Sequence, residues 1–183
     1  YMTLFPYTTL FRSVQNILLG DANIKNKTKD LSKVQEVDHF FKYRADVKGI
    51  TDQQGSGRCW MFTSMNALRP TAQKKYDYNK FDFSHNYNYF WDMLEKSNLY
   101  LENMIRTADK DITDQEVVWY LKSPVGDGGV WNLFYNLGEK YGVVPQEVMP
   151  ETIHSNNTGQ MLGVINRRLK KAGYDIREVY AQK

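Results

Sequence analysis

The chain contains a single cysteine, Cys59, and its surroundings are typical of a nucleophile. The polar, glycine-rich stretch 51–58 precedes it, and the apolar run Trp60-Met61-Phe62 follows it. A lone thiol forms no internal disulfide and is a poor metal site, but a thiolate attacks carbonyl carbon. The pattern predicts that the cysteine stands at the N-terminus of a buried helix, where unpaired N–H groups favour an anion.

Gln53 is the neighbouring residue best suited to assist such a thiol. It lies six positions before Cys59, so its amide could turn toward the sulfur. An oxyanion hole needs a neutral donor of this kind beside a backbone N–H, such as that of the cysteine. Gln54 is the alternative at the adjacent position. For the thiol itself, the alternative is a small, buried and inert side chain.

Residues 53–60 resemble the nucleophile segment of papain-like cysteine peptidases, in which a Gln precedes a small-residue loop and a Cys-Trp pair. The sequence Ser56-Gly57-Arg58-Cys59-Trp60 lacks the first cysteine of the papain signature and resembles the bleomycin hydrolase and aminopeptidase C branch. Further segments similar to this branch are 14–16, 37–41, 83–87, 90–98, 127–131, 140–145 and 149–152.

The resemblance implies an α+β papain-like fold, of which this chain forms mainly the helical lobe. It implies a cysteine aminopeptidase that hydrolyses peptide bonds at peptide N-termini through an acyl-enzyme, with Cys59 as nucleophile and Gln53 in the oxyanion hole. It assigns pairing with the substrate backbone to Gly128 and Gly129, since glycine allows two backbones to approach closely. The implied partners are peptide substrates and further copies in a homohexamer, in the cytoplasm and without a cofactor.

A cysteine peptidase also needs a His that accepts the thiol proton and a group that orients this His. In papain-type sequences the His and an Asn follow the cysteine by ~130–150 residues, which from Cys59 passes residue 183. We therefore expect structural roles for His39, His85 and His154, and an inactive fragment truncated before its base. A non-catalytic binding or scaffold relative and another acyl-transfer enzyme on the same fold are the alternatives.

The chain divides by composition into three predicted parts. Residues 1–13 resemble the translation of a sequencing adapter and are predicted not to belong to the natural protein; a short β-prone extension is the alternative. Residues 14–50 are predicted to form an N-terminal arm or extended segment. Residues 51–183 are predicted to form the helical lobe.

Composition excludes several other classes of protein. With 42% hydrophobic residues the chain can bury one core, and its net charge of +3 is too small to indicate a nucleic-acid partner. No apolar run approaches the ~18 residues that span a membrane. No His and Cys spacing suits zinc. The basic cluster 167–171 is predicted to be a solvated face near a helix C-terminus.

Apolar periodicity and capping residues predict five helices after residue 58. The predicted helices are 59–68, ended by Pro70; 84–106, capped by Ser84; one that starts with a Thr113…Glu116 capping box; 130–141, ended by Gly142; and 158–172, ended by Gly173 and followed by a strand over 174–180. On the second of these helices the apolar positions predicted to lie near one another are Phe90, Met93, Leu94, Leu101, Met104 and Ile105, and the third carries Val117, Val118 and Leu121. The positions predicted to face the core are Leu133, Phe134, Leu137, Met161, Leu162, Ile165 and Leu169.

Overall fold

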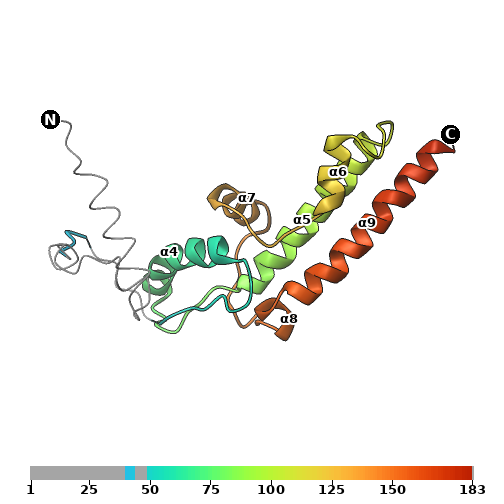
Figure 1. Cartoon of the computed structure of the whole chain (residues 1–183). Helices are drawn as coiled ribbons and strands as arrows, with labels where there is room; N and C mark the ends of the chain where they lie inside the picture. The colour runs from blue at the N-terminus through green and yellow to red at the C-terminus, as the bar shows by residue number, and fades with distance from the viewer. Residues whose placement is uncertain (1–39, 44–48, 183) are drawn as a thin grey trace, which may run out of the picture. The chain divides into compact units, whose positions relative to one another are not determined.

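The computed structural model describes residues 40–43 and 49–182 (Figure 1). The chain divides into two units, Tyr1–Arg44 and Ala45–Lys183. The predicted segment 1–13 and most of 14–50 lie outside the described residues. The helices of the second unit are α4 (Cys59–Tyr76), α5 (His85–Arg106), α6 (Gln115–Lys122), α7 (Trp131–Tyr141), α8 (Ile153–Asn156) and α9 (Gly159–Ala181). Among the described residues, β-structure is limited to two isolated bridges, Gly55 with Asn157 and Phe83 with Pro145.

Helix α4 runs through Pro70, so the helix end predicted at that proline is wrong. A proline inside a helix costs about 3 kcal/mol because it removes a hydrogen bond and crowds the preceding turn. Two buried side chains flank it and bind the segment that follows the helix. Arg69 forms an ion pair with Asp82 at 3.3 Å, and Gln73 Nε2 donates to the Phe81 carbonyl at 3.1 Å. These tertiary contacts offset the cost of the proline.

Helix α5 begins as predicted, with Ser84 Oγ accepting the backbone N–H of Tyr87 at 3.0 Å. Its core face carries the buried side chains of Met93 and Met104. The other apolar positions do not all share that face. Phe90, Leu94 and Ile105 are exposed, because the helices that cover α5 pack on a narrower stripe than the apolar positions occupy.

The start of α6 differs from the predicted capping box. Asp114 caps the helix by accepting the Glu116 N–H at 2.9 Å, while Thr113 Oγ1 donates to Asp111. The Glu116 carboxylate is drawn outward by two cations, one of which is Lys110 at 2.6 Å, and therefore does not fold back on the cap.

Helix α7 ends as predicted at Gly142, whose φ of 76° lies in the region that favours glycine. Phe134 and Leu137 are buried in the core, as predicted. Leu133 of α7, a predicted core position, is instead exposed, and so is the apolar Val118 of α6. The apolar periodicity therefore identifies the buried stripe of each helix and overestimates its width.

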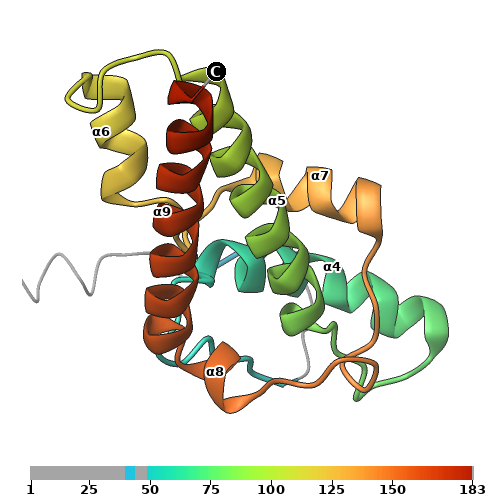
Figure 2. The same cartoon turned by 90° about the vertical axis from the view of Figure 1, so that its right-hand side faces the viewer.

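Helix α9 continues past Gly173 to Ala181, so both the helix end predicted at Gly173 and the strand predicted over 174–180 are wrong. Figures 1 and 2 show α9 lying along α5. Gly173 is buried at this contact: a Cβ there would lie 2.6 Å from the Tyr100 hydroxyl and 3.1 Å from Met104. The glycine thus allows two helices to approach closely instead of ending one.

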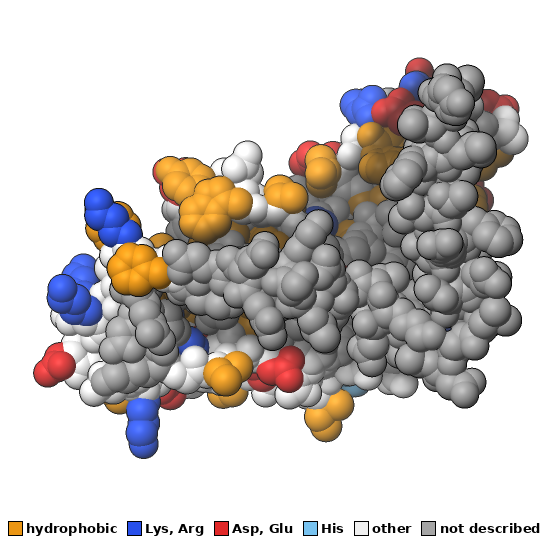
Figure 3. All heavy atoms as spheres, turned by 60° about the vertical axis from the view of Figure 1, so that its left-hand side comes forward, with side chains coloured by type: hydrophobic (Ala, Val, Ile, Leu, Met, Phe, Trp, Pro, Cys, Tyr) orange, Lys and Arg blue, Asp and Glu red, His pale blue; other side chains and the backbone are white. Residues whose placement is uncertain are grey.

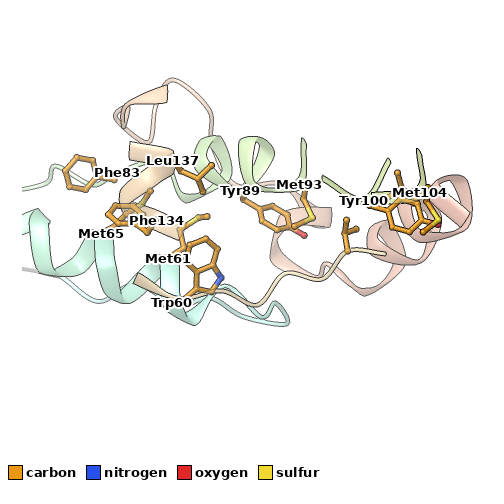
Figure 4. Packing of buried hydrophobic residues seen from close by; sticks show 12 residues of the cluster. Trp60, Met61, Met65, Phe83, Tyr89, Met93, Tyr100, Met104, Phe134 and Leu137 are labelled. Carbon is orange, nitrogen blue, oxygen red and sulfur yellow. The ribbon is translucent and has the colours of Figure 1, made fainter. Parts of the chain in front are cut away.

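The buried core follows α5 along its length (Figure 4). At one end, Trp60 and Met61 of α4 lie near Phe134 of α7, and at the other Tyr100 and Met104 pack together. Figure 3 shows that hydrophobic side chains also remain exposed on the face it presents. Among residues 40–43 and 49–182, no helix has the length and hydrophobicity needed to cross a membrane.

Candidate active site

Cys59 is the first residue of α4 and is exposed, while its neighbours Arg58 and Trp60 are buried. The helix predicted to open at the cysteine is therefore confirmed, and the alternative in which Cys59 is a small, buried side chain is wrong. The Arg58 carbonyl accepts the N–H groups of Met61 and Phe62 at 3.0 Å each and so closes the first turn. The thiol thus stands at a well-formed helix N-terminus, which favours a nearby anion.

Arg58 fixes the backbone immediately before Cys59. Its Nη1 and Nη2 donate to the two carboxylate oxygens of Glu151 at 3.0 and 2.9 Å, and its Nε donates to Ser56 Oγ at 3.0 Å. Ser155 Oγ donates to the same carboxylate at 2.6 Å. A fully buried guanidinium is stable only when a partner neutralises it and its N–H groups are engaged, and this arrangement provides both.

Asp127 connects the loop before the cysteine to a second loop, residues 126–129. Its Oδ2 accepts the backbone N–H of Gly57 at 2.7 Å and the hydroxyl of Thr158 at 2.6 Å. Burial opposes ionisation of this carboxyl, but the hydrogen bonds it accepts, from Thr158 and from backbone N–H groups, together with the charge of Lys96 hold its pKa below the ordinary value. A Cβ on Gly57 would lie 2.4 Å from Asp127 Oδ1, so the glycine is required for this contact.

The predicted substrate-pairing residues Gly128 and Gly129 have different surroundings. A Cβ on Gly129 would lie 2.4 Å from the indole of Trp60, whereas Gly128 has open space around it. The Gly128 carbonyl already accepts a hydrogen bond from Lys96 Nζ at 2.7 Å. The structure therefore brings Gly129 against the residue that follows Cys59, while the carbonyl of Gly128 binds Lys96.

Gln53 lies in the loop that leads to Cys59, but its amide is engaged locally. Its Nε2 donates to the Ser56 carbonyl at 2.6 Å, and Ser56 Oγ donates back to the Gln53 carbonyl at 2.6 Å. The adjacent Gln54 has a φ of 52° and donates its backbone N–H to Asp52. The oxyanion role of Gln53 stays a prediction.

Of the two described histidines, His85 has a structural position and His154 is exposed in α8. His85 is buried and stacks on the Phe62 ring, with ring centroids 3.7 Å apart. Burial lowers the pKa of His85 to about 4, although Asp82 and Glu151 act in the opposite direction. Among the described residues, neither His85 nor His154 forms a hydrogen bond with Cys59. His39 lies outside them.

Sequence reasoning did not identify Arg58, Asp127 and Lys96 as parts of the site. A signal existed for two of them, since Arg58 immediately precedes Cys59 and Asp127 immediately precedes the glycine pair. Nothing in the sequence indicated which residues bind Arg58, Asp127 and Lys96. In the described part of the chain, no cluster of three or more His, Cys, Asp or Glu side chains could hold a metal ion.

The fold and this cysteine loop agree with the family that sequence comparison identifies. The chain belongs to the Peptidase C1-like family, whose sequence profile matches residues 8–183. The crystal structure of PepW from Lactobacillus rhamnosis HN001 superposes with a TM-score of 0.84 at 32% identity, covering 98% of this chain and 39% of that one. The predicted papain-like fold, mainly helical in the part described, is thereby confirmed.

The named relatives are aminopeptidases and a hydrolase. The chain is 39% identical to aminopeptidase C of Lactobacillus helveticus over 156 residues, which cover 85% of this chain and 35% of that protein. It is 35% identical to bleomycin hydrolase of Gallus gallus over 152 residues, or 81% of this chain and 33% of that protein. The predicted resemblance to this branch is confirmed, and the chain spans about a third of the length of these relatives.

Proposed function

We propose that this chain carries the thiol of a cysteine aminopeptidase, which hydrolyses peptide bonds at peptide N-termini, and that Cys59 is the nucleophile. The names of the relatives support the class of enzyme. The observation that carries the proposal is the placement of the thiol. Cys59 is exposed at the start of α4, while Arg58 and Trp60 on either side are buried and hydrogen-bonded.

In the proposed reaction the Cys59 thiolate attacks the scissile carbonyl carbon, and a C–S bond forms as the carbonyl electron pair moves to oxygen. The backbone N–H of Cys59 and the amide of Gln53 stabilise this oxyanion. Gln53 Nε2 carries two hydrogens, and the bond to Ser56 uses one of them. The second remains available to the oxyanion. The oxyanion then re-forms the carbonyl, the C–N bond breaks, and the amine leaves with the proton that the base took from the thiol. Water hydrolyses the resulting thioester and releases the Cys59 thiol.

Substrate backbone pairing falls mainly to Gly129. Lys96 engages the carbonyl of Gly128, so the peptide groups that remain for a substrate are the N–H of Gly128 and both groups of Gly129. The packing of Gly129 on Trp60 supports this assignment, because it brings the glycine to the start of the cysteine helix.

The proton acceptor for the thiol comes from outside the described residues in this proposal. His85 is buried against Phe62 and has a pKa of about 4, so it is a poor base at neutral pH. We therefore expect residues 1–183 alone not to turn over substrate. A homohexamer and a cytoplasmic location complete the proposal and rest on the family resemblance; the lack of a second cysteine agrees with a reducing compartment.

The proposal is tested in the longest reading frame that contains residues 1–183. We expect this protein to release the fluorophore from aminoacyl substrates, to incorporate the epoxide E-64 at Cys59, and to lose both properties in Cys59→Ala. The 183-residue chain provides the comparison and should show no turnover. A Cys59 that reacts with iodoacetamide no faster than free cysteine in the longer protein would instead favour the non-catalytic scaffold.

A further inference from the structure

Lys96 of α5 uses all three hydrogens of its ammonium group within the molecule. Its Nζ donates to Asp92 Oδ2 at 2.7 Å and to the carbonyls of Gly126 and Gly128 at 3.0 and 2.7 Å. The same nitrogen lies 5.5 Å from the centre of the Trp60 ring, within cation–π range. One side chain therefore connects α5, the 126–129 loop and the residue that follows the cysteine.

Asp92 holds this ammonium group from within the same helix. Its carboxylate is 3% exposed and lies one turn before Lys96, the order that stabilises an i,i+4 pair. Burial raises the pKa of Asp92 to about 6, against the effect of Lys96, and the charge of Asp127 adds to the rise. A carboxylate in this position needs its cation, so each side chain restricts the other.

We propose that Lys96 is a positioning residue for the site: it fixes the carbonyls of Gly126 and Gly128 and so holds the 126–129 loop against Trp60. This inference rests on the proposed function, in which the loop pairs with the substrate backbone. Lys96 touches neither the thiol loop nor the reacting atoms in this scheme. It acts through the loop, and its loss should weaken substrate binding more than the chemical step.

Two observations distinguish this role from that of an ordinary pair on a helix surface. The loop is held from both sides, by Asp127 toward the backbone of Gly57 and by Lys96 toward α5. In contrast, the i,i+4 pair Lys171–Asp175 of α9 is 70% and 54% exposed, and its two hydrogen bonds join only those side chains. It is therefore a matched control with the same chemistry and no loop to position.

The first test is hydrogen–deuterium exchange in the 183-residue chain, which does not depend on peptidase activity. We expect Lys96→Met to speed exchange of the hydrogen-bonded amides of segment 125–134, those of Val125, Leu133 and Phe134, by about tenfold, because two charge-assisted hydrogen bonds that hold the loop between them are lost. Lys96→Arg should restore most of the protection, and Lys171→Met should change nothing there. Equal exchange in Lys96→Met and the unchanged chain would overturn the inference.

The second test uses the longest reading frame that contains the chain. There Lys96→Met should raise KM about tenfold and change kcat little, with partial recovery in Lys96→Arg. Unchanged KM in an active protein would overturn the positioning role and leave the proposed function standing. Absence of activity in the unmutated protein would contradict the proposed function, while the exchange experiment would still decide whether Lys96 positions the loop.

A variant that does not fold is replaced by a milder one. Lys96→Gln keeps most of the apolar stem and one amide donor group, so it should fold where Lys96→Met does not. Exchange of the Val125, Leu133 and Phe134 amides should still be faster in Lys96→Gln than in Lys96→Arg, because a neutral amide cannot bind Asp92 and both carbonyls. Exchange equal to that of the unchanged chain would overturn the inference.

Discussion

Gly129 lies directly on the indole ring of Trp60, so closely that a Cβ would lie 2.4 Å from Cε2 of the ring. The same ring donates its Nε1–H to the Asp127 carbonyl at 2.9 Å. Since Trp60 follows Cys59 in α4, the 126–129 loop and the thiol are connected through a single rigid side chain. Disturbing either partner should therefore affect the other.

The first prediction compares two neighbouring glycines. Gly129→Ala should destabilise the chain by about 1–3 kcal/mol, because the added methyl forces the loop away from Trp60. Gly128→Ala should change stability by less than about 0.5 kcal/mol, since that position is open. Urea unfolding measures both effects, and labelling of Cys59 by iodoacetamide follows the site. Equal effects of the two substitutions would contradict the packing described.

The second prediction concerns the buried ion pair beside the thiol. Arg58→Met should destabilise the chain by about 3–5 kcal/mol, because it leaves the Glu151 carboxylate without its partner. Arg58→Lys should recover only part of this, since an ammonium group cannot make the bidentate contact.

Arg106→Met is the control for the loss of an arginine, because Arg106 is exposed and pairs with Glu116 at the surface. It should change the urea midpoint only slightly. If Arg58→Met and Arg106→Met lower the free energy of unfolding by similar amounts, the buried pair is not important for stability.

The third prediction follows from the low pKa of His85, about 4 in the folded chain against an ordinary value near 6.5. The unfolded chain binds more protons between these values, so this residue's contribution to stability is present above pH ~6.5 and lost as pH falls toward ~4. The loss amounts to about 3 kcal/mol. His85→Phe, which retains a ring to stack on Phe62, should remove this dependence. The measurement is the free energy of unfolding in urea at pH 4, 5, 6 and 7, compared between His85→Phe and the unchanged chain.

The fourth prediction has the opposite sign and concerns Asp92, whose folded pKa is about 6 against an ordinary value near 4. Here the folded chain binds the proton more tightly. The contribution of Asp92 to the free energy of unfolding is present below pH ~4 and is lost as pH rises toward ~6. The loss amounts to about 3 kcal/mol. Asp92→Asn should remove this fall. For each variant, the difference in free energy of unfolding from the unchanged chain should change with pH. These changes should have opposite signs for Asp92→Asn and His85→Phe, and changes of the same sign would refute one of the two pKa assignments.

The fifth prediction uses two glycines of α9. Gly163→Ala should stabilise the chain by about 1 kcal/mol, because its surroundings are open and alanine favours helix. Gly173→Ala gains the same propensity but meets the buried Tyr100 and Met104, so it should destabilise the chain. Thermal or urea unfolding of the two variants separates packing from propensity, and stabilisation by both would contradict the close approach of α5 and α9.

The sequence predicted the starts of α4, α5 and α7 closely, because capping and apolar spacing are local signals. It failed where distant contacts decide the outcome. Pro70 and Gly173 both favour a helix end locally, yet buried contacts keep α4 and α9 helical. The same limit applies to the site. The position of Cys59 follows from its own segment, whereas nothing near Arg58 in the sequence points to Glu151 as its partner.

The contacts that seat the thiol join residues far apart in the chain, and this sets an order of events during synthesis. Gly57 is hydrogen-bonded to Asp127, 70 positions later in the sequence, and Arg58 to Glu151, 93 positions later. On a ribosome that adds 5–20 residues per second, roughly 5–20 seconds separate translation of the cysteine from that of its last anchor. A newly made Cys59 therefore acquires its oriented position only after the segment that carries Glu151 has been made.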